Sequence, residues 1–172
     1  IFSFPEFIYE QSQDKQRIVI GGSHGKTTIT SMVMHVLNYF GRKFDYAVGA
    51  SVKGFENTVK LSDDAPIIII EGDEYLSSPI DSTPKFHKYK HHIGLISGIS
   101  WDHINVFPTE DEYVKQFEIF ADATPKAGSL ICCEEDPITS MIASKERADV
   151  HAINYKTHSH IIDNGVTYLA NG

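Results

Sequence analysis

Short apolar runs alternate with amphipathic stretches along most of the chain. The runs predict strands at residues 17–20, 44–49, 65–75, 92–100, 128–133 and 149–154. After the first run, apolar residues recur at helical spacing from Ile29 to Phe40, and Gly41 stands where a C-terminal cap is expected. The isoleucines 67–70 favour a strand buried on both faces, which is typical of parallel sheets. The pattern therefore predicts an α/β fold with a doubly wound, mostly parallel sheet.

Capping and turn signals mark the remaining elements. Thr109 and Glu112 form a capping box that opens a helix carrying Phe117 and Phe120. Asp136 and Pro137 are the residues expected at the start of another helix. Near the end of the chain, Asn164-Gly165 lies between alternating residues and predicts a C-terminal β-hairpin over 160–170. Residues 1–16 show no clear period, and we expect them to be a linker or the tail of a preceding domain.

The first strand leads into the segment GGSHGKTT, residues 21–28, directly before the first helix. A helix N-terminus offers unpaired N–H groups and the positive end of the helix dipole, and glycines let a phosphate approach the backbone. Lys26 can neutralise the outer phosphates, and the Thr27 hydroxyl can bind the accompanying Mg²⁺. The general G-x-x-x-x-G-K-[ST] motif fails at its first glycine, where this chain has Ile20. A glycine-rich turn without a ligand is the alternative, which the agreement of strand, loop and helix disfavours.

Two other predicted strands also end in polar residues, at 71–75 (EGDEY) and 100–103 (SWDH). Since ligands bind at the carboxyl ends of parallel strands, these segments could share one edge of the sheet with the glycine-rich loop. Glu71 is a candidate Mg²⁺ ligand, with a solvated strand end as the alternative. His103 is as consistent with a structural role as with a ligand role. The roles of Asp73, Glu74 and Asp102 stay open.

Charge and composition exclude several classes of protein. The net charge of −8 argues against nucleic-acid binding. No apolar run approaches the length of a membrane span, and the first residues do not resemble a secretory signal. The adjacent Cys132 and Cys133 lie in a predicted strand and do not suggest a disulfide scaffold, so we expect a cytoplasmic protein. Six further histidines lack metal-ligand spacing and are predicted to be surface residues: His87, His91, His92, His151, His158 and His160.

Three ordered motifs carry a family resemblance. GSHGKTT (22–28), IIEGDEY (69–75) and DHINVFPTEDEYVKQF (102–117) resemble motifs of the Mur ligases, the ATP-dependent amide-bond ligases of peptidoglycan synthesis, and VGA (48–50) supports them. The resemblance implies that residues 17–172 are a central ATP-binding domain, incomplete at its C-terminal end, of a longer chain with N- and C-terminal domains. It also implies that Lys26 and His103 are catalytic and that Mg²⁺, or Mn²⁺, is bound by Thr27, Glu71 and His103. The residues implied to bind ATP are Gly22, Ser23, His24, Gly25, Lys26, Thr27 and Thr28.

Two departures from the family pattern narrow the resemblance. Gly98 stands where several members have asparagine, and Phe117 stands where several have a carbamoylated lysine. The absence of that lysine points to the branch that adds an amino acid or a peptide to UDP-N-acetylmuramate. The implied acceptor amine is the tripeptide L-Ala-γ-D-Glu-meso-diaminopimelate, as in peptidoglycan recycling, with L-alanine as the alternative.

Two hypotheses of other classes remain. The isolated chain could be a phosphate-binding module without turnover, or it could be a small-molecule kinase with the same loop. A kinase would need an arginine clamp, and the chain has only Arg17, Arg42 and Arg147, of which only Arg17 is near a predicted strand exit in sequence.

Overall fold

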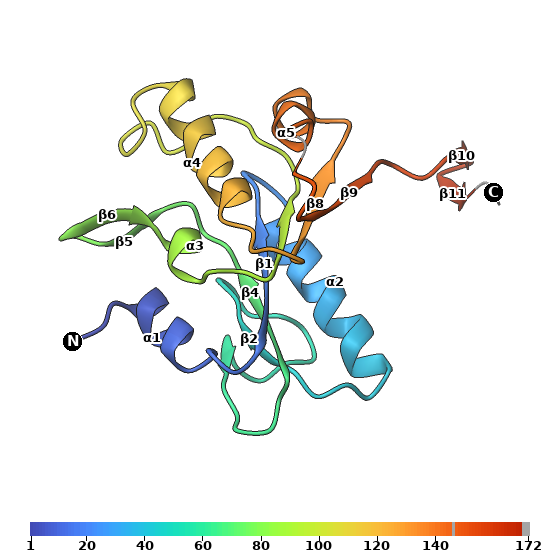
Figure 1. The fold of residues 1–172 in the computed structure, drawn as a ribbon. Helices are drawn as coiled ribbons and strands as arrows, with labels where there is room; N and C mark the ends of the chain where they lie inside the picture. The colour runs from blue at the N-terminus through green and yellow to red at the C-terminus, as the bar shows by residue number, and fades with distance from the viewer. Residues whose placement is uncertain (146, 170–172) are drawn as a thin grey trace.

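A seven-stranded sheet forms the centre of the computed structural model, which describes residues 1–145 and 147–169 (Figure 1). Its strands are β1 (Gln16–Gly21), β2 (Asp45–Ala47), β3 (Val59–Lys60), β4 (Ile67–Glu71), β7 (Ile93–Ile96), β8 (Ser129–Cys133) and β9 (His151–Tyr155). They lie in the order β3-β2-β4-β1-β7-β8-β9. All neighbouring pairs are parallel except β2 and β3, which are antiparallel. The predicted α/β fold with a mostly parallel sheet is therefore confirmed.

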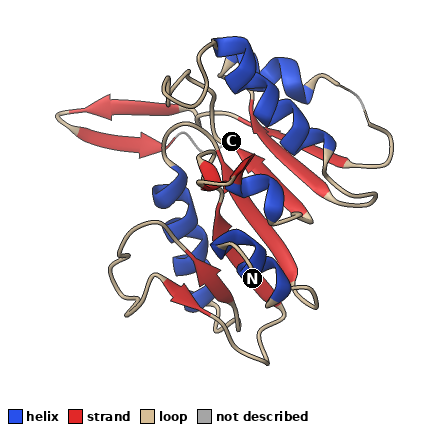
Figure 2. Cartoon of the chain, turned by 90° about the vertical axis from the view of Figure 1, so that its left-hand side faces the viewer, coloured by secondary structure: helices blue, strands red, loops and turns tan. Residues whose placement is uncertain are grey.

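Helices cover both faces of this sheet (Figures 1 and 2). The helices are α1 (Phe4–Glu10), α2 (Lys26–Tyr39), α3 (Lys85–Lys88), α4 (Glu110–Asp122) and α5 (Pro137–Ala143). Helix α2 packs on β1 and β4, whereas α4 and α5 pack on β7 and β8 from the other face. The isoleucines of β4 serve both layers: Ile69 packs in the cluster with Met34 of α2, and Ile68 and Ile70 pack in the cluster with Phe86. A strand buried on both faces is what the isoleucine run predicted.

The predicted N-caps Thr109 and Asp136 are present, and several predicted strands are longer than the strands that form. The Thr109 side chain accepts a hydrogen bond from the Glu112 N–H, and Asp136 Oδ1 accepts one of 2.7 Å from the Thr139 N–H. The segments predicted as strands at 44–49, 65–75 and 92–100 form only β2, β4 and β7, and the polar residues after Glu71 and Ile96 leave the sheet as loops. The hairpin consists of β10 (His160–Asp163) and β11 (Val166–Leu169), and Ala170 lies outside the described residues.

The sequence pattern did not predict the short helix that forms near the start of the chain. Residues 4–10 form α1, although the Ser3–Glu6 capping box was available as a signal. Ile8 is fully buried in the main core, and Lys15 makes a buried ion pair of 3.2 Å with Asp45 of β2. Ile8 and Lys15 thus attach this segment to the sheet domain, and the assignment of residues 1–16 to a linker or to the tail of a preceding domain stays a prediction. A second hairpin, β5 (Leu76–Ser78) and β6 (Asp81–Pro84), was also missed.

The prediction that six histidines lie on the surface is wrong for His91. Its ring is buried, 4.1 Å from the Phe120 ring, and Nε2 lies 2.9 Å from the Thr124 hydroxyl oxygen. His87 and His92 are partly buried, whereas the histidines of the C-terminal segment are exposed as predicted. Burial of His91 depends on α4 packing across β7, which spacing alone does not show.

Among the described residues, no helix combines the length and apolar character needed to cross a bilayer.

Candidate functional site

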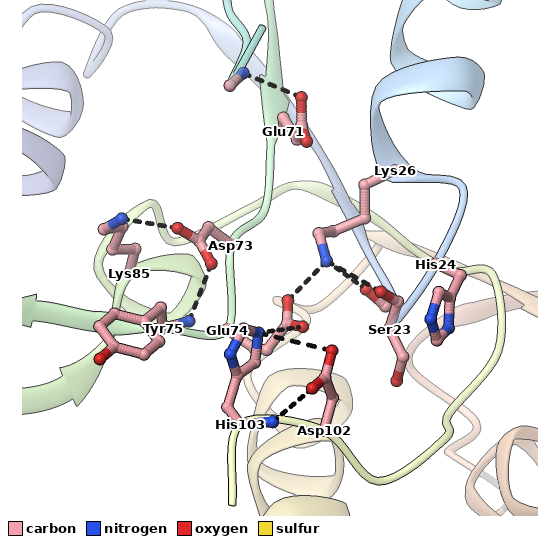
Figure 3. A network of polar contacts seen from close by, with 12 residues as sticks. Ser23, His24, Lys26, Glu71, Asp73, Glu74, Tyr75, Lys85, Asp102 and His103 are labelled. Atoms are coloured by element: carbon pink, nitrogen blue, oxygen red, sulfur yellow. Dashed lines mark hydrogen bonds and ion pairs between the residues drawn. The ribbon is translucent and has the colours of Figure 1, made fainter. Parts of the chain in front are cut away.

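The three polar strand exits meet at one edge of the sheet, as predicted (Figure 3). They follow β4, β1 and β7, which are neighbours in the sheet, so the segments from Glu71, from Gly22 and from Ser97 lie side by side. Cross-links join them: the Ser97 N–H donates to the Gly21 carbonyl, and the Ser23 N–H donates to the Gly98 carbonyl. The site is therefore built from three segments that lie far apart in the sequence, at residues 22–28, 71–75 and 97–103.

Two glycines shape the loop, Gly22 because a side chain would not fit there and Gly25 because its backbone is left-handed. Gly22 has φ +132°, and a Cβ there would lie 2.0 Å from the Ser97 hydroxyl oxygen. Gly25 is the N-cap of α2 with φ +79°, a left-handed conformation that favours glycine. Because Gly25 has no side chain to cap the helix, the N–H groups of the first turn are left for a ligand. Lys26 and Thr27 are half-buried at this turn, whereas His24 and Thr28 are exposed.

Ser23 supports the loop from within. Its hydroxyl oxygen accepts a 2.8 Å hydrogen bond from the Ser100 N–H and lies 2.8 Å from the Tyr113 hydroxyl. Burial raises the pKa of Tyr113, so this phenol stays protonated and donates to Glu74. The Ser23 hydroxyl must then donate to the Tyr113 oxygen. Since its N–H is also used, by Gly98, both donors of Ser23 are engaged inside the fold. Its predicted role in ATP binding stays a prediction.

Lys26 points into the loop from the start of α2 (Figure 3). Its ammonium donates to the Gly22 carbonyl at 2.7 Å and to Glu74 Oε2 at 2.8 Å, with the Ser23 carbonyl at 3.4 Å. The Lys26 side chain is 14% exposed and that of Glu74 is 0% exposed. The Lys26 ammonium thus lies beside the N-terminus of α2, so its charge adds to the positive end of the helix dipole.

Thr27 and Glu71 are brought together across the same edge. The Thr27 hydroxyl donates to Glu71 Oε1 at 2.7 Å, and Glu71 Oε2 accepts a 2.9 Å hydrogen bond from the Gly49 N–H. Magnesium is commonly held by one or two protein oxygens together with waters and phosphate oxygens. A carboxylate and a hydroxyl at hydrogen-bond distance beside a phosphate loop fit that donor set. The pairing supports the predicted Mg²⁺ roles of Thr27 and Glu71, which stay predictions.

His103 lies in the same site but next to a different carboxylate. Its Nε2 is 3.4 Å from Glu74 Oε1 and 4.0 Å from Asp102 Oδ2, and its ring packs edge-on against Tyr75 at 5.3 Å. The backbone of His103 has φ +56°, an uncommon conformation that often marks functional positions. In residues 1–145 and 147–169, no three His, Cys, Asp or Glu side chains form a group able to hold a metal. His103 therefore joins the site, while its predicted metal role stays a prediction.

Sequence reasoning left Asp73, Glu74 and Asp102 open, and the structure separates them. Glu74 is buried between Lys26, Tyr113 and His103. Asp102 Oδ1 accepts a 2.7 Å hydrogen bond from the His103 N–H and shapes that turn. Asp73 pairs with Lys85 at 2.6 Å. Burial acts to raise the pKa of Asp73, but the hydrogen bonds from Lys85 and Tyr75 outweigh it, and the pKa lies below its ordinary value.

The family profile described as Mur ligase middle domain matches residues 20–169, a range that includes every residue of this site. The chain belongs to the Mur ligase family. A UDP-N-acetylmuramate–L-alanine ligase of Roseiflexus sp. is 26% identical over 144 residues, which are 84% of this chain and 29% of that protein. The UDP-N-acetylmuramate–L-alanyl-gamma-D-glutamyl-meso-2,6-diaminoheptandioate ligase of Haemophilus influenzae is 30% identical over 130 residues, which are 75% of this chain and 28% of that protein. The chain thus spans less than a third of these relatives.

Solved structures show the same fold as this Mur ligase middle domain. The UDP-N-acetylmuramate:L-alanyl-gamma-D-glutamyl-meso-diaminopimelate ligase from Neisseria meningitides superimposes with a TM-score of 0.80 at 20% identity, covering 95% of this chain and 57% of that chain. The UDP-N-acetylmuramate-alanine ligase from Thermotoga maritima superimposes with a TM-score of 0.63 at 22% identity, covering 81% of this chain and 30% of that chain. The architecture is therefore that of the family, and Phe117 is fully buried in the core.

Proposed function

We propose that this chain is the ATP-binding domain of a cytoplasmic Mur-type ligase that joins UDP-N-acetylmuramate to the tripeptide L-Ala-γ-D-Glu-meso-diaminopimelate, as murein peptide ligases do. One observation carries the proposal: Lys26 and Thr27 open α2 beside a glycine loop, and Thr27 contacts Glu71 at 2.7 Å. Lysine, hydroxyl and carboxylate then surround the place where the outer phosphates of ATP would bind. Domains outside residues 1–172 would bind the uridine nucleotide and the peptide.

The mechanism implied has two steps. An oxygen of the lactyl carboxylate attacks the γ-phosphorus of ATP, the bond to the β–γ bridging oxygen breaks, and ADP leaves an acyl phosphate behind. The acceptor amine then forms a bond to the acyl carbon, loses a proton, and inorganic phosphate departs with the carboxylate oxygen that attacked. Neither step requires a protein nucleophile, so this chain contributes placement and electrostatic stabilisation.

Each site residue has a task in the first step. The Lys26 ammonium and the N–H groups of the first turn of α2 offset the negative charge that shifts among the phosphate oxygens. Thr27 and Glu71 would hold Mg²⁺, which supplies further positive charge to the same oxygens. His103, one-third exposed at the neighbouring strand exit, is proposed as a ligand of a second cation, for which Mn²⁺ suits an imidazole better than Mg²⁺ does.

The acceptor amine is the finer part of the proposal, and L-alanine is the second candidate. A relative named as a ligase of L-alanine is 26% identical to this chain, and one named as a ligase of the tripeptide is 30% identical. The two are separated by offering the full-length protein ATP, Mg²⁺ and UDP-N-acetylmuramate with equal concentrations of tripeptide and L-alanine. Mass spectrometry of the products decides: the proposal expects the tripeptide conjugate to predominate, and a predominant L-alanine conjugate would assign the second candidate instead.

The arginines disfavour a small-molecule kinase. Arg17 donates to the carbonyls of Ser12 and Lys90, and Arg147 pairs with Asp149. Arg42 follows the C-terminal end of α2, roughly 20 Å from the phosphate loop at 1.5 Å per helical residue. The three arginines are therefore placed away from the loop in the part of the chain that the structure describes. A binding module without turnover would bind nucleotide in the full-length protein but release no phosphate with any acceptor.

A further inference from the structure

The Glu74 carboxylate connects the nucleotide loop with His103. Its side chain is fully buried at the exit of β4, and its two oxygens have different partners. Oε2 accepts from the Lys26 ammonium at 2.8 Å, and Oε1 lies 3.4 Å from His103 Nε2 (Figure 3). Oε1 also accepts a 3.1 Å hydrogen bond from the Tyr113 hydroxyl. A buried carboxylate needs such partners, because an uncompensated charge in the interior is costly.

Lys26 is fully engaged by the protein in this arrangement. An ammonium has three N–H donors, and three oxygens surround this one: the carbonyls of Gly22 and Ser23 and the carboxylate of Glu74. A phosphate oxygen can bind Lys26 only if one of these partners gives way. Glu74 carries the only full negative charge among them, so it attracts the ammonium most strongly and repels an incoming phosphate.

We propose, on the basis of the proposed function, that Glu74 is a positioning residue that competes with the nucleotide for Lys26. Before ATP binds, Glu74 keeps the lysine inside the loop. When phosphate arrives, Lys26 transfers to it, and the carboxylate stays between Tyr113 and His103. The Glu74 carboxylate thus positions the Lys26 ammonium and the His103 ring. Because it competes with the phosphates, it also lowers the affinity for the nucleotide.

This role predicts opposite effects on affinity and on turnover. Glu74→Gln keeps the size of the side chain and removes its charge. The variant loses a competitor of the phosphates, so nucleotide should bind more tightly. Lys26 and His103 lose their common anchor, so kcat should fall. A carboxylate that only stabilised the fold would change both quantities in the unfavourable direction or leave both unchanged.

Asp73→Asn is the matched control. Asp73 adjoins Glu74 in sequence, and the substitution removes the same charge. Its carboxylate pairs with Lys85 at 2.6 Å and accepts from the Tyr75 N–H, and its side chain is 36% exposed. If tighter binding came from a general loss of negative charge near the loop, Asp73→Asn would show it too. The proposal expects its nucleotide affinity to stay within twofold of wild type.

The experiment uses the full-length protein and a non-hydrolysable ATP analogue in titration calorimetry, followed by kcat for the same preparations. For Glu74→Gln the expected result is at least roughly threefold tighter binding, a cost of about 0.6 kcal/mol in the wild type, with at least roughly tenfold lower kcat. Unchanged or weaker binding in a folded Glu74→Gln protein overturns the inference. Wild type that does not bind the analogue overturns the proposed function instead.

A crystal structure of the wild-type complex with the analogue decides the matter even if Glu74→Gln fails to fold. The inference expects the Lys26 ammonium to bond a phosphate oxygen and to lie beyond hydrogen-bond distance of Glu74 Oε2. A complex in which Lys26 binds phosphate and still holds Glu74 at about its present 2.8 Å would show that the two do not compete.

Discussion

The Thr27 hydroxyl donates a 2.7 Å hydrogen bond to Glu71 Oε1, although 44 residues separate the two in sequence. The contact exists because β1 and β4 pair in parallel, so that Ile20 lies opposite Glu71 and both strands end at the same edge. The parallel sheet thereby places the first turn of α2 against the carboxylate that follows the isoleucine run. This pair is the most direct candidate for a Mg²⁺ site in the chain.

Glu71→Gln tests this pair. The amide keeps the size of the side chain but is a poor Mg²⁺ ligand, so the Mg²⁺ concentration for half-maximal turnover of the full-length protein should rise at least ~10-fold. Glu56→Gln, an exposed glutamate before β3, is the control and should leave the Mg²⁺ curve in place. A Glu71→Gln protein with an unshifted Mg²⁺ titration would remove Glu71 from the metal site.

Lys26→Ala should abolish ATP turnover and also lower stability. Glu74 is fully buried, so deleting its cation leaves a charge that Tyr113 and His103 only partly compensate. Loss of one partner of a buried pair typically costs about 3–5 kcal/mol in the free energy of unfolding. The double variant Lys26→Ala/Glu74→Gln removes both charges and should regain much of that loss while staying inactive. Urea unfolding of the three proteins measures this coupling, and a double variant no more stable than Lys26→Ala would contradict the account.

His103→Asn separates the imidazole from the backbone at that position. Asparagine tolerates the left-handed conformation, so the turn at φ +56° should survive. If His103 binds a cation, the variant should melt within a few degrees of wild type and need more divalent metal for turnover. A large fall in melting temperature with an unshifted metal curve would assign His103 a structural role.

His91 should make the fold sensitive to acid. Burial lowers its pKa from 6.5 to about 3, with smaller contributions from His92, His87 and Arg17. Between these values the unfolded chain holds a proton on His91 that the folded chain lacks, so stability is lost as the pH falls. The loss amounts to at most about 1.4 kcal/mol per pH unit. His91→Gln, which can still bond Thr124, should flatten this dependence in urea unfolding between pH 4.5 and 7, and the exposed His151→Gln should not. Equal slopes in all three proteins would disprove the assignment.

The sequence was informative where one segment carries the whole signal. The glycines, Lys26 and Thr27 lie within one strand–helix junction, and the isoleucines of β4 predict a strand that is buried on both faces. Contacts between distant segments were not predictable in the same way. Nothing in the sequence near Glu74 shows that its carboxylate is buried against Lys26, 48 residues earlier, because that depends on the order of β4 and β1 in the sheet. The burial of His91 likewise follows from the position of Phe120 on α4.

The amphipathic pattern of α2 predicted the helix but not which of its residues are buried. The apolar positions fixed the helix, but the residues buried deepest are Thr30 and Met34. Met32, Val36 and Phe40 are at least half exposed, and Met32 and Val36 border an apolar groove with Leu95, Ile131 and Tyr155. A periodic stripe identifies a helix, whereas its rotation on the sheet is decided by packing.

Transfer of oxygen from the sugar nucleotide to phosphate tests the central claim most directly. UDP-N-acetylmuramate labelled with ¹⁸O in its lactyl carboxylate is incubated with the full-length protein, ATP, Mg²⁺ and the tripeptide, and the released phosphate is examined by mass spectrometry. If the carboxylate attacks the γ-phosphorus, each phosphate formed leaves with one carboxylate oxygen and carries the label. Phosphate that is released without ¹⁸O, or at the same rate when the sugar nucleotide is omitted, would contradict a Mur-type ligase reaction at this site.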